Sequence, residues 1–450
     1  MQKELLDRFL SSFNLDRKLI KYDIEACIAW ITTLFENKII DKKQSSRLIK
    51  VLKNLKKQKD LKNIQAEDVH YAVEKKLERV LKKDKYLAGV IRTARSRNDL
   101  VVSDERMYIK DEINQIIVLL KNLISSIVEV AQKNLDVPMV GYTHLQPAQP
   151  VLFSHYILSF AWWFVRDIER FKDCYKRVDV STLGAAAFAG SSFEVNRQKV
   201  AEKLGFLKVS ENSVDSVSDR DYIIEFISCC AIVMIHLSRI AEELIIWCTP
   251  NFGYISLPKK LTSGSSIMPQ KQNPDYLELI RGKTAKVISD LIGILVVMKA
   301  LPLTYNRDMQ EDKVYLFSSV ETIKDCLRVM RVIFENLMVN AQRLKEDIQK
   351  HDFIFATEVA NFLVEEMKYP FKLAHKKTQL LIDYCVKTNK KLKQLGLKDY
   401  KKIVSREFTI EMFEKLNRKF NNSYSNYKTF GGSSLPQVKR QIKNIKKLIV

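Results

Sequence analysis

Residues 223–237, IIEFISCCAIVMIHL, carry almost no polar side chains and indicate the fold class of this chain. They lie in a longer apolar run, residues 222–248. Polar side chains interrupt this run at Glu225, His236, Arg239, Glu242 and Glu243. These interruptions argue against a membrane span and predict a helix buried inside the protein. A helix that is apolar all round must be covered on every side.

Other long segments show helical periodicity. From residue 103 to 135, apolar side chains recur about every 3.6 residues, with Ser103 and Asp104 as candidate caps. Comparable segments cover residues 151–178, 219–248, 275–299 and 311–345. Pro274 suits the first turn of the segment at 275–299, because a missing N–H costs nothing there. The pattern predicts an all-α bundle that also packs against other copies of the chain.

Shorter helices are expected on both sides of this bundle. The sequence therefore predicts an N-terminal helical domain (1–102), a central long-helix domain (103–346) and a C-terminal helical domain (347–450).

The net charge and the cysteine spacing limit which partners and which kinds of site the protein can have. The 75 Lys and Arg residues exceed the 53 Asp and Glu residues and give a net charge of +22, which suits nucleic acid, an anionic membrane surface or small anionic substrates. The cations are spread along the chain, so solvated faces are favoured and neither nucleic acid nor membrane is expected as a partner. Seven cysteines without C-x-x-C spacing indicate reduced thiols and no zinc site. With no apolar signal core at the N-terminus, we expect a cytoplasmic protein.

Three polar stretches stand out between the helical segments. They are IRTARSRND (91–99), GYTHLQPAQP (141–150) and GSSIMPQKQNP (264–274). The first stretch can be read as an arginine-rich helix cap and the second contains a lone histidine, and both features often have only a structural role. The third stretch is the most specific indication of function. Its glycine and serines permit a mobile loop, and a linker has no need of Lys271, Asn273 and the nearby Glu278.

The polar groups of these stretches suit removal of a proton next to a carboxylate. Such a reaction needs a base, an acid for the leaving group, and cationic or N–H donors for the developing negative charge. No metal-ligand pattern or nucleotide loop occurs in the sequence, so we expect neither a metal nor a cofactor.

The third stretch resembles the signature of the fumarase/aspartase superfamily, and the chain as a whole is most similar to the argininosuccinate lyase family within it. The similarity extends to RSRND (95–99), GYTHLQPAQPVLFSHY (141–156), NSVDSVSDRDYIIEF (212–226), PLTYNRDMQEDK (302–313) and FGGSSLPQVKRQI (430–442). It covers nearly the whole chain and is weakest over the first ninety residues.

The resemblance implies a three-domain all-α fold. A central five-helix bundle would form a twenty-helix core in a homotetramer, and each active site would be shared between subunits. The implied activity is elimination of fumarate from argininosuccinate to release arginine, a step of arginine biosynthesis.

The resemblance also implies roles for individual residues. Ser265 would abstract the proton, and His144, paired with Glu278, would act at the leaving nitrogen. Lys271 and Asn273 would stabilise the charged intermediate. Succinyl-side contacts are implied for Ser96, Arg97, Asn98 and Thr143, and contacts to the remainder of the substrate for Tyr305, Gln310 and Lys313.

Some positions depart from the family pattern. Where members commonly have HTGRSRNDQ, this chain has Arg92, Ala94 and Leu100 in place of the histidine, glycine and glutamine. Ala26 and Cys27 stand where a Gly-Ser pair is usual. Two alternatives stay open: a sister lyase that releases fumarate from a different N-succinyl amine, and a basic helical protein that binds nucleic acid or has no catalytic activity.

Overall fold

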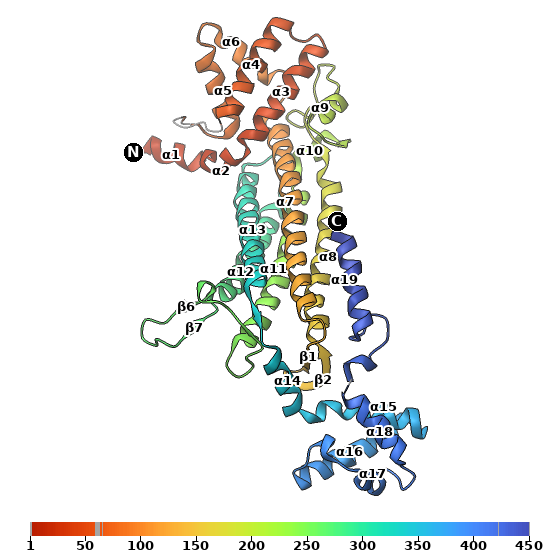
Figure 1. Ribbon diagram of the computed structural model, residues 1–450. Helices are drawn as coiled ribbons and strands as arrows, with labels where there is room; N and C mark the ends of the chain where they lie inside the picture. Colours follow the sequence, from red (N-terminus) through yellow and green to blue (C-terminus); the bar gives the residue numbers. More distant parts are fainter. Residues whose placement is uncertain (1, 59–63, 65, 422, 450) are drawn as a thin grey trace. The chain divides into compact units, whose positions relative to one another are not determined.

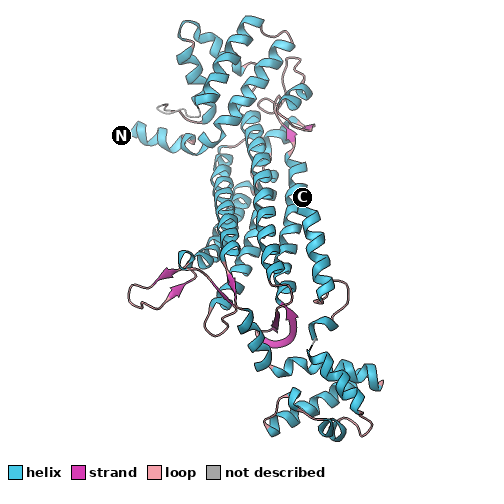
Figure 2. Cartoon of the chain, in the orientation of Figure 1, coloured by secondary structure: helices cyan, strands magenta, loops and turns pink. Residues whose placement is uncertain are grey.

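The computed structural model describes residues 2–58, 64, 66–421 and 423–449. These residues form helices with a few short strands (Figures 1 and 2), so the predicted all-α class is confirmed. By internal contacts the chain divides into two compact units. Unit 1 comprises Met1–Leu119, Asp167–Ile235 and Gly282–Cys326, and unit 2 comprises Leu120–Arg166, His236–Arg281 and Leu327–Val450. The predicted domain boundaries at residues 102 and 346 stay a prediction.

Five long helices contribute residues to both units. They are α7 (Arg97–Lys133), α8 (Phe153–Val178), α11 (Asp221–Cys248), α12 (Asp275–Met298) and α13 (Asp312–Asn336). Two of them, α7 and α11, are long and apolar enough to cross a membrane by length and composition alone, and 50% and 56% of their apolar windows are buried inside the chain. Burial of this kind is what the core helix of a bundle shows.

The remaining elements of unit 1 are short. Its helices are α1 (Gln2–Leu10), α2 (Phe13–Asp16), α3 (Ile20–Glu36), α4 (Lys42–Gln58), α5 (Val69–Val80), α6 (Lys85–Gly89), α9 (Arg197–Lys203) and α10 (Ser213–Ser218). Its 3₁₀ turns are η1 (Arg17–Leu19), η2 (Lys82–Asp84), η3 (Val90–Arg92) and η5 (Arg307–Glu311). Strands β3 (Val180–Ser181) and β4 (Lys208–Val209) pair in parallel.

The remaining elements of unit 2 include the C-terminal helices and three antiparallel strand pairs. Its helices are α14 (Ala341–Lys350), α15 (Ala356–Met367), α16 (Phe371–Thr388), α17 (Leu397–Ile403), α18 (Ile410–Asn421) and α19 (Leu435–Ile449). Its 3₁₀ turns are η4 (Lys259–Leu261), η6 (Asp352–Phe355), η7 (Leu392–Gln394) and η8 (Ser423–Asn426). The pairs are β1 (Pro138–Thr143) with β2 (Gln146–Leu152), β5 (Ile255–Ser256) with β8 (Met338–Val339), and β6 (Ser263–Gly264) with β7 (Gln272–Asn273).

Close side-chain packing joins the long helices within unit 1. Phe171 of α8 and Phe226 of α11 have ring centroids 6.0 Å apart. Between α12 and α13 the approach is closer, because a Cβ added at Gly293 would lie 2.2 Å from the ring of Tyr315. Only glycine fits at that position, so the spacing of these two helices depends on it.

The start of α7 differs from the prediction. The helix begins at Arg97, and Ser103 and Asp104 lie inside it and are buried. The hydroxyl of Ser103 is bonded to Asp99 O and to Thr182 Oγ1, so it does not cap the helix. The sequence does not distinguish a capping serine from a buried serine whose hydrogen-bond partner lies far along the chain.

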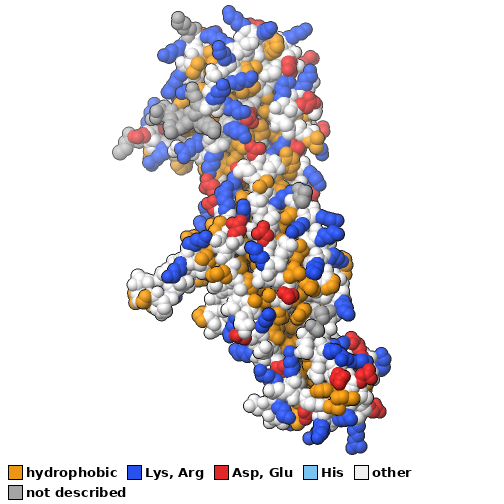
Figure 3. All heavy atoms as spheres, viewed as in Figure 1, with side chains coloured by type: hydrophobic (Ala, Val, Ile, Leu, Met, Phe, Trp, Pro, Cys, Tyr) orange, Lys and Arg blue, Asp and Glu red, His pale blue; other side chains and the backbone are white. Residues whose placement is uncertain are grey.

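Large apolar side chains are exposed along α12 in unit 1. Ile288, Ile292, Leu295 and Val296 are 36%, 56%, 47% and 65% exposed, and their spacing of three to four residues places them on one face of the helix. Figure 3 shows the distribution of hydrophobic and charged side chains over one side of the molecule. A contiguous exposed apolar face indicates an interaction surface.

Candidate active site

The first polar stretch forms the N-terminus of α7. Ser96 precedes the helix, and its Oγ accepts a hydrogen bond from the Asn98 N–H at 3.2 Å. Asp99 accepts from the Ser96 N–H at 3.1 Å and from the Gly184 N–H at 2.8 Å, which fixes the helix start against the loop that follows β3. Because a helix N-terminus carries partial positive charge, this turn suits a substrate carboxylate.

Arg97 connects this turn to the stretch that contains Tyr305 and Gln310. Its guanidinium lies 2.8 Å from Asp68 and 3.8 Å from Glu67. Glu67 also binds Arg307 of η5 at 2.7 Å, and Arg307 donates to Gln310 Oε1 at 3.1 Å. Unit 1 therefore brings Arg97 close to the 305–313 stretch through the shared carboxylate of Glu67.

Lys313 lies in a buried charge network that the sequence analysis did not anticipate. Its ammonium is 2.6 Å from Asp312 and 3.1 Å from Glu105. Arg220 binds Asp312 at 2.7 Å, and Tyr222 donates to Glu105 at 2.6 Å. Burial opposes the charged form of the lysine, but the neighbouring carboxylates outweigh it and raise the pKa of Lys313.

Tyr305 is half-buried in unit 1. Burial raises the pKa of Tyr305, and the nearby ammonium of Lys313 acts against this effect. The phenol therefore stays protonated at neutral pH and can donate a hydrogen bond to a ligand.

The second polar stretch forms a β-hairpin. Strands β1 and β2 pair from Pro138↔Leu152 to Thr143↔Gln146. The turn consists of His144 and Leu145, with φ of +55° and +56°. Two positive φ values give a tight turn whose twist matches the strands, a conformation that usually takes Asn-Gly. Thr143 and His144 are exposed at the hairpin tip.

The third polar stretch is a loop between β6 and β7, and Figure 1 shows it standing away from the helices of its own unit. Ser265 is half-buried, and its Oγ accepts hydrogen bonds from the backbone N–H groups of Ile267 at 3.3 Å and Met268 at 3.1 Å. Ser266 and Lys271 are exposed. The base of the loop is held by Asn273, which pairs with Ser263 across the two strands.

The residues of unit 2 with implied roles come from the β1–β2 hairpin, the β6–β7 loop and the start of α12. Glu278 is exposed on the first turns of α12. Among the described residues, no hydrogen bond or ion pair joins His144 to Glu278, or either of them to Ser265.

Most of the residues that depart from the family pattern are buried within unit 1. Ala26 and Cys27 are buried, and the Cys27 Sγ lies 3.4 Å from the guanidinium of Arg95. Burial raises the pKa of the Cys27 thiol to about 12, so the thiol is neutral. The pair therefore fills the interior of this unit.

The other substituted positions are also accounted for by the structure. Arg92 donates to Glu74 at 2.9 Å, and Leu100 is 2% exposed. Ala94 has φ of +60°, the left-handed region that favours glycine. The backbone conformation is therefore one that glycine adopts easily, although the residue is alanine.

A family model described as lyase matches residues 2–289, and one described as argininosuccinate lyase C-terminal matches residues 353–420. The argininosuccinate lyase of Caldicellulosiruptor bescii is 42% identical over 99% of this chain and 96% of its own length. That of Bacillus thuringiensis is 39% identical over 99% and 95%.

Solved structures share the fold at lower identity. An EDDS lyase has a TM-score of 0.84 at 23% identity and covers 96% of this chain and 87% of its own. A fumarate lyase from Mesorhizobium sp. BNC1 has a TM-score of 0.77 at 18% identity, with 95% of each chain covered. At these identities the likeness shows the fold alone.

Proposed function

We propose that this chain, which belongs to the argininosuccinate lyase family, eliminates fumarate from 2-(N-arginino)succinate and releases arginine. The observation that carries the proposal is the identity of about 40% to several argininosuccinate lyases over almost the full length of both proteins. The protein is thus a carbon–nitrogen lyase, and its step belongs to arginine biosynthesis.

Ser265 is the proposed base. It takes a proton from the carbon next to a substrate carboxylate, and the electron pair of that C–H bond forms the C=C bond of fumarate. The C–N bond breaks, and the electron pair of the C–N bond leaves with the nitrogen. A serine hydroxyl is a weak base, so the reaction needs a stabilised alkoxide. The N–H groups of Ile267 and Met268 already point at Oγ and supply part of that stabilisation.

His144 is the proposed acid at the leaving nitrogen, oriented by Glu278. Both residues are exposed and no hydrogen bond joins them within the described residues, which is consistent with a pair completed by another subunit. The exposed apolar face of α12 supports assembly into a homotetramer with shared active sites, since another copy of α12 would cover it.

The other residues with implied roles bind the substrate in this proposal. Ser96, Arg97, Asn98 and Thr143 hold the succinyl end, with the N-terminus of α7 facing a carboxylate. Lys271 and Asn273 stabilise the negative charge that develops on the carboxylate of the intermediate, and the exposed ammonium of Lys271 is available for this task.

Tyr305, Gln310 and Lys313 are proposed to contact the arginine end. Contact by Lys313 would require its ammonium to leave one of the two carboxylates that hold it, Asp312 or Glu105. Tyr305 is only half-buried, so it can reach a ligand without such a rearrangement.

A sister lyase with a different amine leaving group is not favoured by the structure. That alternative rests on the substitutions at positions 26, 27, 94 and 100. The side chains at positions 26, 27 and 100 are buried, and Ala94 adopts a positive φ. A nucleic-acid partner is not favoured either, because the cations are dispersed along the chain. We propose a cytoplasmic location, with neither nucleic acid nor membrane as a partner.

The direct test is incubation of the purified protein with argininosuccinate. Ultraviolet absorbance follows the fumarate formed, and amino-acid analysis measures arginine. The proposal requires the two products in equal amounts, with the Ser265→Ala variant as the blank. Absence of both products from a folded, assembled protein would refute it.

A further inference from the structure

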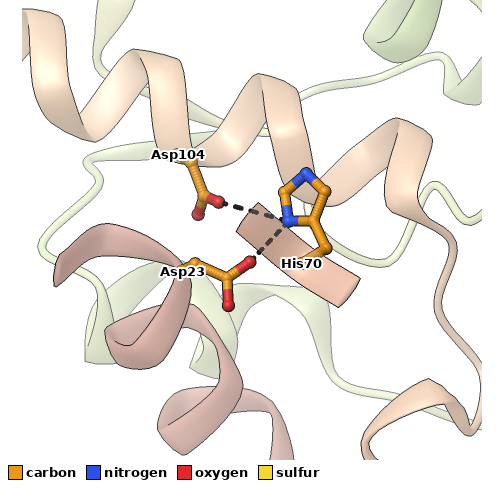
Figure 4. Close-up of side chains that lie close together, drawn as sticks. All are labelled: Asp23, His70 and Asp104. Atoms are coloured by element: carbon orange, nitrogen blue, oxygen red, sulfur yellow. Dashed lines mark hydrogen bonds and ion pairs between the residues drawn. The ribbon is translucent and has the colours of Figure 1, made fainter. Parts of the chain in front are cut away.

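Three buried side chains from separate helices of unit 1 converge on one point (Figure 4). Asp23 lies on α3, His70 on α5 and Asp104 on α7. The His70 Nδ1 is 2.5 Å from Asp23 Oδ2 and 3.8 Å from Asp104 Oδ2. One ligand atom from each residue lies within 4.8 Å of the other two.

Asp104 is the member of this cluster that lacks a hydrogen-bond donor. Its side chain is 0% exposed, and neither carboxylate oxygen has a hydrogen-bond partner among the described residues. In Figure 4 the carboxylate points at the His70 ring. A buried carboxylate without partners costs several kcal/mol unless a cation or a proton compensates it.

The charged groups around the cluster leave room for a further positive charge. Asp16 and Asp68 act on His70, and Glu105 acts on Asp104. Lys313 and Arg220 pair with Glu105, Arg97 pairs with Asp68, and Lys313 also acts on Asp16. The two carboxylates of the cluster, Asp23 and Asp104, share the single charge of Arg95.

We propose that Asp23, His70 and Asp104 form a binding site for a divalent transition-metal ion of the Zn²⁺ type. Zinc binds imidazole nitrogen and carboxylate oxygen at about 2.0–2.2 Å, which places neighbouring ligand atoms about 3.4 Å apart. The observed spacings of 2.5 and 3.8 Å lie on either side of that value, so small side-chain rotations suffice.

Nearby groups favour zinc over a hard cation. The cluster includes the imidazole of His70. An imidazole ligand suits zinc better than magnesium, which prefers oxygen ligands and water. The ion would join α3, α5 and α7 and thereby fix the helix that follows Ser96 and carries Arg97 and Asn98 in its first turn. It is a positioning element and takes no part in the elimination.

Calorimetric titration of the full-length, untagged, chelator-treated protein with Zn²⁺ tests the site. The result expected is one ion per chain, with an affinity that rises with pH because bound histidine and carboxylate must be deprotonated. The melting temperature should rise with the Zn²⁺ concentration. Failure of the folded wild-type protein to bind Zn²⁺ would overturn the proposal without any variant.

Two near-isosteric variants locate the bound ion. Asp104→Asn and His70→Asn should each weaken Zn²⁺ binding by at least about 100-fold, because each removes a direct ligand. Asp290→Asn is the matched control, since Asp290 is a buried carboxylate outside the cluster, held by Ser318 and Ser319. Zinc binding that survives both ligand substitutions in folded protein would place the ion elsewhere and refute the site.

Discussion

Replacement of Ser265 by alanine removes the proposed base and leaves the substrate-binding groups in place. The two N–H donors at 3.1 and 3.3 Å from Oγ would then have no oxygen to stabilise. A general base contributes about 10²–10⁴-fold to a rate. We therefore expect kcat to fall by about two to four orders of magnitude.

The KM of this variant should change little, because Lys271 and Asn273 stay available to the substrate. An interaction made only in the transition state is lost from kcat and from kcat/KM alike. Steady-state rates of fumarate formation over a range of argininosuccinate concentrations separate the two constants, and circular dichroism checks that the variant is folded.

Ser266 provides the matched control for this experiment. It is the adjacent serine and it is exposed. Ser266→Ala should keep kcat within about threefold of the wild type, since no transition-state contact is assigned to it. A mild Ser265→Ala together with a severe Ser266→Ala would refute the assignment, and two mild variants would show that the base lies elsewhere.

Three further results are expected. The first experiment mixes equal amounts of Ser265→Ala and His144→Asn subunits and refolds them together. About a quarter of the wild-type activity should return, because random assembly gives that fraction of the sites both an intact Ser265 and an intact His144. If no activity returns, the active sites are not shared between subunits. Ala94→Gly should raise the unfolding free energy by about 1 kcal/mol by relieving a positive φ, and a lower denaturant midpoint would contradict this. Asp312→Asn should lower the free energy of unfolding by about 3–5 kcal/mol, because it leaves buried cations without a counter-charge. Denaturant unfolding measures this change, and Asp308→Asn, at an exposed aspartate, should leave the free energy of unfolding nearly unchanged.

The long helices could be predicted from sequence because their signal is local. Apolar side chains at a 3.6-residue period located α8, α11 and α12 to within about two residues at each end. The signal failed where the chain changes structure without losing its apolar character. The helix predicted over residues 311–345 ends at Asn336, where Met338 and Val339 pair with β5, and α14 begins beyond Asn340.

The site was predictable only in part, for a related reason. Ser265, His144 and Lys271 lie in polar stretches between apolar helices, so composition marks these stretches, whereas the roles of the three residues are implied by the family resemblance and stay a prediction. The partners of Lys313 could not be found in this way, since Glu105, Arg220 and Tyr222 lie far from it in sequence and meet only after folding. The Asp23–His70–Asp104 cluster was missed on the same grounds, because its members lie on three helices.

The most direct test of the proposed function compares kcat/KM for argininosuccinate with the values for other N-succinyl amines. The purified protein and a single assay of fumarate formation suffice for the whole series. We expect argininosuccinate to give the highest kcat/KM, with arginine and fumarate formed in equal amounts. A higher kcat/KM for a different N-succinyl amine would make the protein a sister lyase, and no fumarate from any of them would contradict the account as a whole.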